Sequence, residues 1–330
     1  MTARGTLESR RMVLLRVLAA SGSSGLGEAV PMSLRGGNSL EEIVDQLEGW
    51  GKLAVTGPEM PDITRMSPPA RVAVETALAD VASRDLGVPL HEFLVPGSVA
   101  QPVPCNATLT TDTPGRVLSQ AELWAADGFT TFKLKVGSGD DAGQVEAVRK
   151  GLGEGVSIRV DANAAWDEEQ AEDVLSRIEP FDVELAEQPV DGIAALARLR
   201  QKTSISIVAD ESVSSREEAE MAAVARACDA VTVKLSKIGS LDASLGGHLP
   251  TYLSSALDGP VGIAAAAHVA QTLPRDGAWS NVAHGLATER LFDGTIAAQG
   301  RLLDGPNLPV PVGNGLGITI DEAALETYRL

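Results

Sequence analysis

The stretch Phe132-Lys133-Leu134-Lys135-Val136-Gly137 is an apolar run that carries two lysines and ends at a glycine. Side chains two positions apart in a β-strand point to the same face, so Lys133 and Lys135 share one face of the expected strand. Lysines are almost never fully buried unless they are paired or used. The stretch therefore predicts a buried strand that presents two ammonium groups to a functional site.

The same pattern, a short apolar run that ends in a charged residue, recurs along the chain. After Lys135 the charges come at intervals of 26, 26, 23 and 24 residues, at Asp161, Glu187, Asp210 and Lys234. This interval is the length of one strand–helix unit, and seven or eight such units follow one another from Val103. So many consecutive units favour a parallel barrel over an open sheet.

Composition narrows the classes of partner. The chain has 330 residues with 45 acidic against 27 basic side chains, a net charge of −18, which repels nucleic acid and anionic membranes. The early arginines are not followed by an apolar stretch of signal-peptide length, and no apolar run reaches the roughly 18 residues of a membrane span. Cys105 and Cys228 belong to no motif and are expected in the core. We expect a cytoplasmic protein.

Three regions are expected from the pattern of elements. Residues 1–100 form an α+β unit, with a turn at Gly22–Gly27 and a helix that starts at a Ser39–Glu42 capping box. Residues 101–299 form the barrel, closed by a weak eighth strand at Ser280–His284. Only a very short helix fits in Gly239–Pro250. Residues 300–330 return to the first unit. The fold class is α/β, a modified (β/α)₇β barrel with an added α+β unit.

The strand-end charges predict a metal site. In a (β/α) barrel the strand C-termini share one rim, and that rim carries the chemistry. Asp161, Glu187 and Asp210 would meet there, and three close carboxylates need a cation. Oxygen ligands favour Mg²⁺, with Mn²⁺ as an alternative. Lys135 and Lys234 would flank the ion. This set suits removal of the proton α to a substrate carboxylate by a lysine, through an enediolate that the metal stabilises.

The motifs that carry these charges resemble one family. They are Lys133-Leu134-Lys135, Asp161-Ala162-Asn163, Glu187-Gln188-Pro189, Asp210-Glu211-Ser212 and Lys234. Their order and spacing are similar to those of the enolase superfamily, muconate-lactonizing-enzyme subgroup, across roughly residues 100–260. Thr2-Ala3-Arg4-Gly5-Thr6 resembles the substrate-covering loop of that subgroup's capping domain. The α+β unit would then be this capping domain, which the C-terminal segment completes.

The resemblance implies a role for each residue. Lys135 would be the base on one face of the substrate, with Lys133 as its electrostatic partner, and Lys234 would stand on the opposite face. The metal ligands would be Asp161, Glu187 and Asp210. Apart from the resemblance, the positions of Asn163 and Glu211 beside these charges suggest that they orient the metal ligands or Lys234, and for Glu211 a plain acidic loop residue is the alternative. Lys237 is open to two interpretations, contact with substrate or exposure to solvent.

Within the family, the end of the seventh strand suggests the substrate, a small carboxylate. Ser254-Ser255-Ala256-Leu257-Asp258, with the following Gly259-Pro260-Val261-Gly262, resembles o-succinylbenzoate synthases, where this segment helps to hold the succinyl part of the substrate. The implied enzyme is a carbon–oxygen lyase of menaquinone biosynthesis. It would catalyse syn dehydration of 2-succinyl-6-hydroxy-2,4-cyclohexadiene-1-carboxylate, with contacts from Ser254, Ser255, Ala256 and Leu257.

Other functions fit parts of the pattern. A dipeptide epimerase or N-acylamino acid racemase of the same superfamily needs both lysine faces, but such epimerases carry an Asp-x-Asp pair where this chain has only Asp258. An aldolase that forms an imine on Lys234 is a different class, although three carboxylates are an odd setting for an imine. A barrel that only binds or assembles requires none of the five charges. Oligomeric state is not indicated by the sequence.

Overall fold

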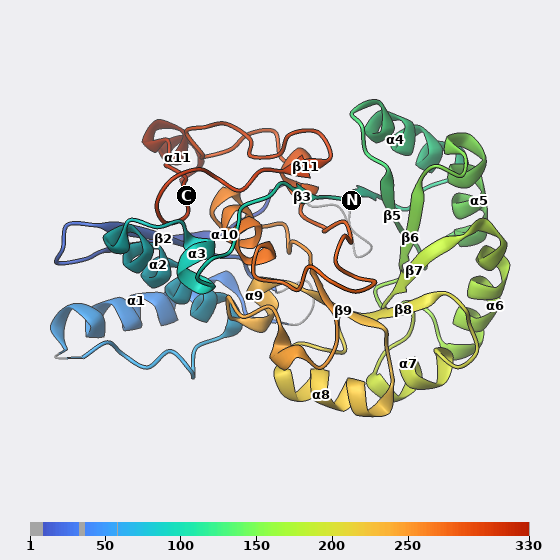
Figure 1. The fold of residues 1–330 in the computed structure, drawn as a ribbon, viewed down its shortest axis with the longest axis horizontal. Helices are drawn as coiled ribbons and strands as arrows, with labels where there is room; N and C mark the ends of the chain where they lie inside the picture. Colours follow the sequence, from blue (N-terminus) through green and yellow to red (C-terminus); the bar gives the residue numbers. More distant parts are fainter. Residues whose placement is uncertain (1–8, 33–36, 58, 330) are drawn as a thin grey trace.

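Seven parallel strands form the central sheet of the chain (Figure 1). The computed structural model describes residues 9–32, 37–57 and 59–329. The strands follow one another in chain order, each hydrogen-bonded to the next, as expected for a barrel wall. They are β4 (Ala107–Leu109), β5 (Thr131–Lys135), β6 (Ser157–Asp161), β7 (Val183–Glu187), β8 (Ser206–Ala209), β9 (Ala230–Val233) and β10 (Thr251–Leu253).

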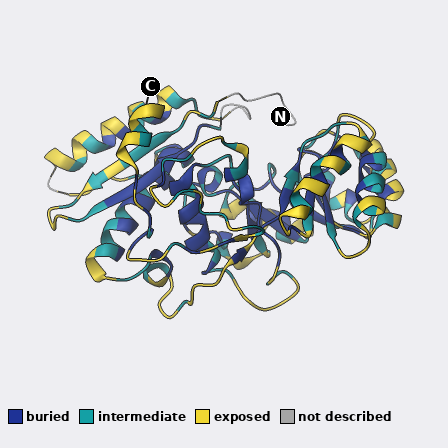
Figure 2. Cartoon of the chain, turned by 90° about the horizontal axis from the view of Figure 1, so that it is seen from above, coloured by how far each residue is buried: buried dark blue, intermediate teal, exposed yellow. Residues whose placement is uncertain are grey.

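Helices cover the outer face of this sheet between successive strands. They are α4 (Pro114–Ala126), α5 (Asp141–Leu152), α6 (Glu168–Ile178), α7 (Ile193–Leu199) and α8 (Arg216–Ala225). Figure 2 shows their outer sides exposed and the strands buried. In α6, Asp167 forms a capping box at the N-terminus, and the buried side chains Ala171, Leu175 and Ile178 recur at helical spacing. One apolar side of the helix therefore packs against the sheet.

The eighth position of the barrel is closed by bridges rather than by a strand. The expected strand at Ser280–His284 is wrong for this chain: the paired residues are His284, which bridges Cys105, and Gly285, which bridges Ser254. Both bridges are parallel, so this short segment joins the two edges of the seven-stranded sheet.

A turn at Gly277–Ser280 precedes the bridged residues, where a strand was expected to start. The Ser280 backbone N–H donates to the Gly277 carbonyl at 3.3 Å, so the chain before the bridge is still turning. The His284 imidazole Nδ1 accepts the Leu253 N–H at 2.9 Å, which gives a strand N–H a side-chain partner in place of a backbone one. The backbone N–H of Leu253, at the end of β10, therefore has a hydrogen-bond partner without a longer strand beside it.

Between β9 and β10 the wall is thin, as the sequence predicts. The connection holds only the four-residue α9 (Leu235–Ile238) and a 3₁₀ turn, η3 (Leu245–Gly247). After β10 comes α10 (Pro260–Ala270), an alanine-rich helix that is buried along most of its length. Other parts of the chain therefore enclose α10 on nearly all sides.

The N-terminal unit packs beside the barrel. The strands β1 (Val13–Leu18) and β2 (Ser24–Ala29) form an antiparallel hairpin, followed by α1 (Leu40–Thr56), α2 (Pro68–Leu86) and α3 (Leu90–Leu94). The Ser39–Glu42 capping box is present at the start of α1.

The turn expected at Gly22–Gly27 is shorter than predicted, because β2 already starts at Ser24. A Cβ atom on Gly27 would lie 1.9 Å from the Ala73 carbonyl oxygen of α2. Glycine in this strand therefore allows close approach of two backbones, which the sequence pattern alone does not distinguish from a turn.

The C-terminal segment lies against the N-terminal unit (Figure 1). Its strand β11 (Asn307–Leu308) pairs with β3 (Val103–Pro104), and its helix α11 (Glu322–Tyr328) contacts β1 through an Arg16–Glu322 ion pair of 2.5 Å. The buried carboxylate of Asp80 in α2 accepts the backbone N–H of Leu316 at 2.8 Å.

Two further sequence expectations concern the whole chain. Cys105 and Cys228 are both buried and neither forms a disulfide, as expected for core residues. Among the described residues, no helix has the length and apolar character needed to cross a membrane.

Candidate active site

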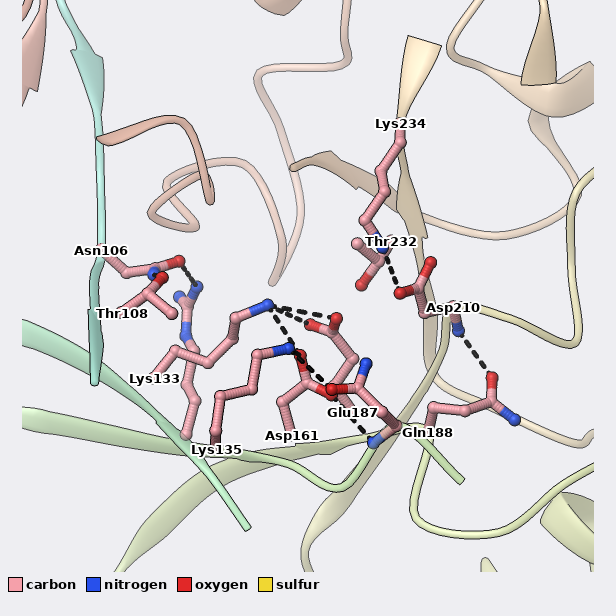
Figure 3. Close-up of polar contacts among 12 residues, drawn as sticks. Asn106, Thr108, Lys133, Lys135, Asp161, Glu187, Gln188, Asp210, Thr232 and Lys234 are labelled. Carbon is pink, nitrogen blue, oxygen red and sulfur yellow. Dashed lines mark hydrogen bonds and ion pairs between the residues drawn. The ribbon is translucent and has the colours of Figure 1, made fainter. Parts of the chain in front are cut away.

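The charged residues that end the strands converge at one end of the sheet. In the parallel register Lys135 pairs with Asp161, and Asp161 pairs with Glu187, so the three strand ends lie side by side. Asp210 and Lys234 directly follow β8 and β9. Figure 3 shows the lysines of β5 reaching this group from one side and Lys234 reaching it from the other.

Lys133 connects two of the carboxylates. Its Nζ donates to Asp161 Oδ2 at 3.0 Å and to the two Glu187 carboxylate oxygens at 3.2 Å each, with only 5% of the side chain exposed. Burial disfavours the ammonium form, but the charges of Glu187 and Asp161 outweigh burial and raise the pKa of Lys133 well above its usual value. Lys133 is therefore a fixed positive charge in this site.

Lys135 differs from its neighbour. Its Nζ lies 2.5 Å from Asp161 Oδ2 and 2.9 Å from Asn163 Oδ1. Burial lowers the pKa of Lys135, and the Lys133 ammonium acts in the same direction, while Asp161 opposes both. A lysine with a lowered pKa has more of its neutral, basic form near neutral pH, so Lys135 is better suited than Lys133 to accept a proton.

Asp161 is the centre of this network. It is fully buried, which raises the pKa of its carboxyl, but the Lys135 and Lys133 ammonium groups outweigh burial and lower that pKa below its usual range. The charge of Asp210 acts on Asp161 in the opposite direction. Two strand-end carboxylates on non-adjacent strands are therefore close enough to influence each other.

Two lysines hold Asp210 on the opposite side. Lys234 Nζ contacts Asp210 Oδ2, and Lys237 Nζ donates to Asp210 Oδ1 at 2.9 Å. Lys237 also donates to the backbone carbonyls of Asp210 at 2.6 Å and Val213 at 2.8 Å. Of the two sequence interpretations of Lys237, exposure to solvent is wrong, because the side chain points inward and fixes a candidate metal ligand, while contact with substrate stays a prediction. Its position one helical turn after Lys234 is the only signal in the sequence.

Asn163 and Glu211 lie next to the lysines and carboxylates of the site. The Asn163 backbone N–H donates to Asp161 Oδ1 at 3.1 Å, and its side-chain amide donates to Glu211 Oε1 at 3.0 Å. Asn163 has a positive φ of 48°, which Asn tolerates better than most residues. The structure thus places Asn163 in contact with Lys135 and Asp161, and Glu211 in contact with Asn163.

Gln188 is an orienting residue that sequence reasoning missed. Its Oε1 accepts the backbone N–H groups of Asp210 at 2.8 Å and Ser212 at 3.1 Å, and its Nε2 donates to the Val190 carbonyl at 2.7 Å. Gln188 is completely buried and has a φ of 40°. It ties the end of β7 to the end of β8, so the positions of Glu187 and Asp210 are coupled.

Tyr252 also escaped prediction because it sits in an apolar strand. Its hydroxyl donates to Glu187 Oε2 at 2.5 Å, and its ring lies 5.6 Å from the Arg159 guanidinium. Tyr252 and Arg159 are both almost completely buried. Burial first, and then the Glu187 charge, raise the pKa of Tyr252, so the phenol stays protonated and donates to the carboxylate.

The three strand-end carboxylates suit a hard cation, and in this structure lysine ammonium groups lie among them. Within residues 9–32, 37–57 and 59–329, no three side chains of the His, Cys, Asp or Glu types stand close enough to hold one ion as they are placed. Asp161, Glu187 and Asp210 are each at most 1% exposed, and each is paired with an ammonium group. Buried carboxylates that need positive charge are the ligands that Mg²⁺ takes in proteins.

The segment after β10 lies beside the strand that precedes Lys234. Ser254 N–H donates to the Val233 carbonyl at 2.8 Å. The Asp258 carboxylate accepts the Ser255 hydroxyl and the Ala256 N–H, each at 2.8 Å, so it closes a local turn. Leu257 has a φ of 66°, a strained conformation for a leucine. Thr2–Thr6, the other segment expected near substrate, is outside the described residues.

A family model and known relatives agree with this geometry. The model described as Enolase C-terminal domain-like matches residues 116–324. A muconate cycloisomerase from Acinetobacter lwoffii is 31% identical, with 98% of this chain and 89% of that protein covered.

Two solved structures are similar over nearly the whole chain. An N-succinyl Arg/Lys racemase from Bacillus cereus has a TM-score of 0.89 at 25% identity, covering 99% of this chain and 92% of that one. A dipeptide epimerase from Cytophaga hutchinsonii, solved with Mg and the dipeptide D-Ala-L-Val, has a TM-score of 0.85 at 26% identity and covers 96% and 90%. With the site geometry above, these matches show that the chain belongs to the enolase superfamily, in its muconate-lactonizing-enzyme subgroup.

Proposed function

We propose that this chain catalyses Mg²⁺-dependent proton transfer at the carbon α to a substrate carboxylate. The observation that carries the proposal is the placement of basic groups, with Lys135 on one side of the buried carboxylates and Lys234 on the other (Figure 3). The dipeptide epimerase from Cytophaga hutchinsonii was solved with Mg, which supports the choice of ion. Asp161, Glu187 and Asp210 would hold it. When bound, Mg²⁺ stabilises negative charge on the substrate carboxylate.

The lysines then have distinct tasks. Lys135, whose pKa is lowered by burial and by Lys133, accepts the α-proton. Lys133 keeps its charge and holds Asp161 and Glu187 in place. Lys234 approaches from the opposite face, where it can deliver a proton to the carbon or stabilise the charge that develops next to it. Removal by one lysine and return by the other inverts the stereocentre.

The finer activity that we propose is racemisation of N-acylated amino acids. The likeness to an N-succinyl Arg/Lys racemase and to a dipeptide epimerase supports a stereocentre-inverting reaction. A substrate with a free ammonium group would need a carboxylate to bind it. Asp258, the acidic residue of the segment after β10, already accepts two hydrogen bonds from that segment. We therefore favour an acylated amino group over the free ammonium of a dipeptide.

A second candidate is o-succinylbenzoate synthase. A difference between the surroundings of the two lysines favours it. Lys135 is held by a carboxylate and a neutral amide, whereas Lys234 is held against Asp210. A syn dehydration needs only one base, and Lys135 would remove the proton and then assist loss of hydroxide, while Lys234 stabilises the enediolate. The resemblance of Ser254–Gly262 to these synthases supports the same candidate. An N-succinyl amino acid and the cyclohexadiene substrate of the synthase both carry a succinyl group near the reacting carboxylate.

One paired assay separates these activities. The protein is incubated with Mg²⁺ in D₂O with N-succinyl amino acids, other N-acyl amino acids and dipeptides, and the α-proton is followed by NMR. In parallel, the cyclohexadiene precursor of o-succinylbenzoate is supplied and product absorbance is recorded. Exchange and inversion without dehydration support the racemase, and fast dehydration supports the synthase. Activity that survives Lys135→Ala in both assays would refute the proposed role of that lysine.

A further inference from the structure

Helix α10 has no N-terminal cap of its own. Its N-cap residue is Gly259, and no side chain within the segment bonds its first N–H groups, which need partners at every helix start. The Gly259 N–H instead donates to Glu28 Oε1 at 2.6 Å, and the Val261 and Gly262 N–H groups also stabilise the Glu28 carboxylate. Glu28 belongs to β2, so a carboxyl group of the N-terminal unit caps a barrel helix.

Two glycines make room for this carboxyl group. A Cβ atom on Gly259 would lie 2.7 Å from Glu28 Oε2, and one on Gly262 would lie 2.9 Å from Glu28 Oε1. Both contacts are too short for a real side chain. Gly259 therefore leaves room for a carboxyl group that is 231 positions earlier in the chain, and Gly262 leaves room for the same group and for the Asp258 side chain, whose Cβ atom would lie 2.8 Å from an added Cβ atom.

A second contact from the N-terminal unit reaches the same segment. Arg10 Nη2 donates to the Ala256 carbonyl at 2.9 Å and to the Pro31 carbonyl at 2.8 Å. The strained Leu257, with its φ of 66°, lies between the Arg10 and Glu28 contacts. A residue in a strained conformation persists only where its surroundings hold it. Two contacts from the N-terminal unit thus hold the two ends of Ala256–Gly259.

Glu28 is also placed next to the end of β10. It is 7% exposed, and among the described residues its Oε2 has no hydrogen-bond partner. A small cavity between the N-terminal unit and the barrel is lined by Glu28, Ser236, Ser254 and Asp258. Burial, and then the charge of Asp258, raise the pKa of Glu28 to about 8. Burial lowers the pKa of Arg10, and the charges of Asp258 and Glu28 oppose that shift. A buried carboxyl group thus borders the expected substrate-binding segment.

We propose that Glu28 is a positioning residue: by capping α10 from the N-terminal unit, it sets the conformation of Ser254–Asp258 and thereby the binding of the substrate. The inference rests on the proposed function in one respect, the contact of this segment with substrate. It assigns a role in substrate binding to a residue that lies outside the group of lysines and carboxylates and has no part in the proton transfer itself.

The test compares Glu28→Ala, Glu28→Gln and a control, Glu48→Ala, an exposed glutamate of the same unit. The readouts are amide hydrogen exchange of residues 254–262, Mg²⁺ affinity by calorimetry, and KM and kcat for whichever substrate the wild type turns over. For Glu28→Ala we expect about tenfold faster exchange in this segment and about tenfold higher KM, with kcat and Mg²⁺ affinity unchanged. Glu28→Gln keeps the acceptor oxygen and should restore both values.

Unchanged exchange of residues 254–262 in Glu28→Ala would overturn the proposal. Faster exchange over the whole chain, with Mg²⁺ affinity and kcat lost together, would also overturn it, because that result indicates a merely structural role. If Glu28→Ala does not fold, Glu28→Asp withdraws the carboxyl group by one methylene from the Gly259 N–H and tests the same contact. If the wild type turns over none of the substrates, the proposed function fails, while the exchange result still decides the role of Glu28.

Discussion

Replacing Lys133 by methionine should lower the stability of the fold more than replacing an exposed lysine does. The Lys133 ammonium is 5% exposed and pairs with Asp161 and Glu187, whose side chains are at most 1% exposed. Removing one partner of a buried ion pair costs about 3–5 kcal/mol. Without Lys133, Asp161 would keep only the Lys135 ammonium and Glu187 only the neutral Tyr252 hydroxyl among the contacts described above. For 330 residues the entropy of unfolding is about 0.7 kcal/mol per degree. The expected fall in Tm is therefore about 4–7 °C.

The assay is calorimetric or circular-dichroism melting in the presence of a chelator, so that bound metal does not contribute. Lys150→Met is the matched control, because Lys150 pairs with Glu146 on the surface with 71% of its side chain exposed. Such a pair contributes about 0.3–0.5 kcal/mol, which is less than about 1 °C. Equal melting temperatures for Lys133→Met and Lys150→Met would refute the argument that the strand-end carboxylates depend on Lys133.

Three further predictions follow from single contacts. Lys237→Met removes the ammonium group that fixes Asp210, and calorimetry should show Mg²⁺ binding weakened by about 10–100-fold; unchanged affinity would contradict the role of Lys237. Tyr252→Phe removes the hydroxyl bonded to Glu187 and should lower the free energy of unfolding by about 1.5–3 kcal/mol in urea titrations, whereas a change below about 0.5 kcal/mol would contradict it. Burial raises the pKa of Glu28 to about 8 from its usual 4.5, so the folded state binds the extra proton and stability falls as pH rises from about 4.5 through about 8. The wild type should therefore lose stability relative to Glu28→Gln over this range in urea titrations, and parallel pH profiles would contradict the shift.

Much of the barrel could be predicted from local pattern. The strands β5, β6 and β7 end at the predicted charges, Lys135, Asp161 and Glu187, because each is a short apolar run that closes on a charged residue. The charged residues followed from the same pattern, since parallel strands place their C-terminal ends at one edge. Register alone brought Lys135, Asp161 and Glu187 together.

The features that were missed depend on contacts between distant parts of the chain. The early start of β2 follows from the close approach of Gly27 to α2, and the short closure at His284–Gly285 follows from hydrogen bonds to both edges of the sheet. Lys237 was ambiguous and Tyr252 was missed because the role of each depends on which carboxylate it faces in the fold. No local pattern identifies such partners.

The choice of substrate was the least predictable part. The Ser254–Gly262 segment resembles o-succinylbenzoate synthases, while a solved neighbour that covers 99% of the chain is an N-succinyl Arg/Lys racemase. Both reactions begin with the same proton abstraction, so the lysines and carboxylates do not separate them. The difference lies in the groups that hold the rest of the substrate, and Thr2–Thr6, which is expected to cover it, lies outside the described residues.

The most direct test of the central claim is stereospecific loss of α-proton exchange in the two lysine variants. Each enantiomer of an N-succinyl amino acid that the wild type accepts is incubated in D₂O with Mg²⁺ and followed by NMR. The account predicts that Lys135→Ala loses exchange of one enantiomer and keeps exchange of the other, and that Lys234→Ala shows the opposite pattern. Exchange of both enantiomers at wild-type rates in Lys135→Ala would contradict the placement of one base on each face.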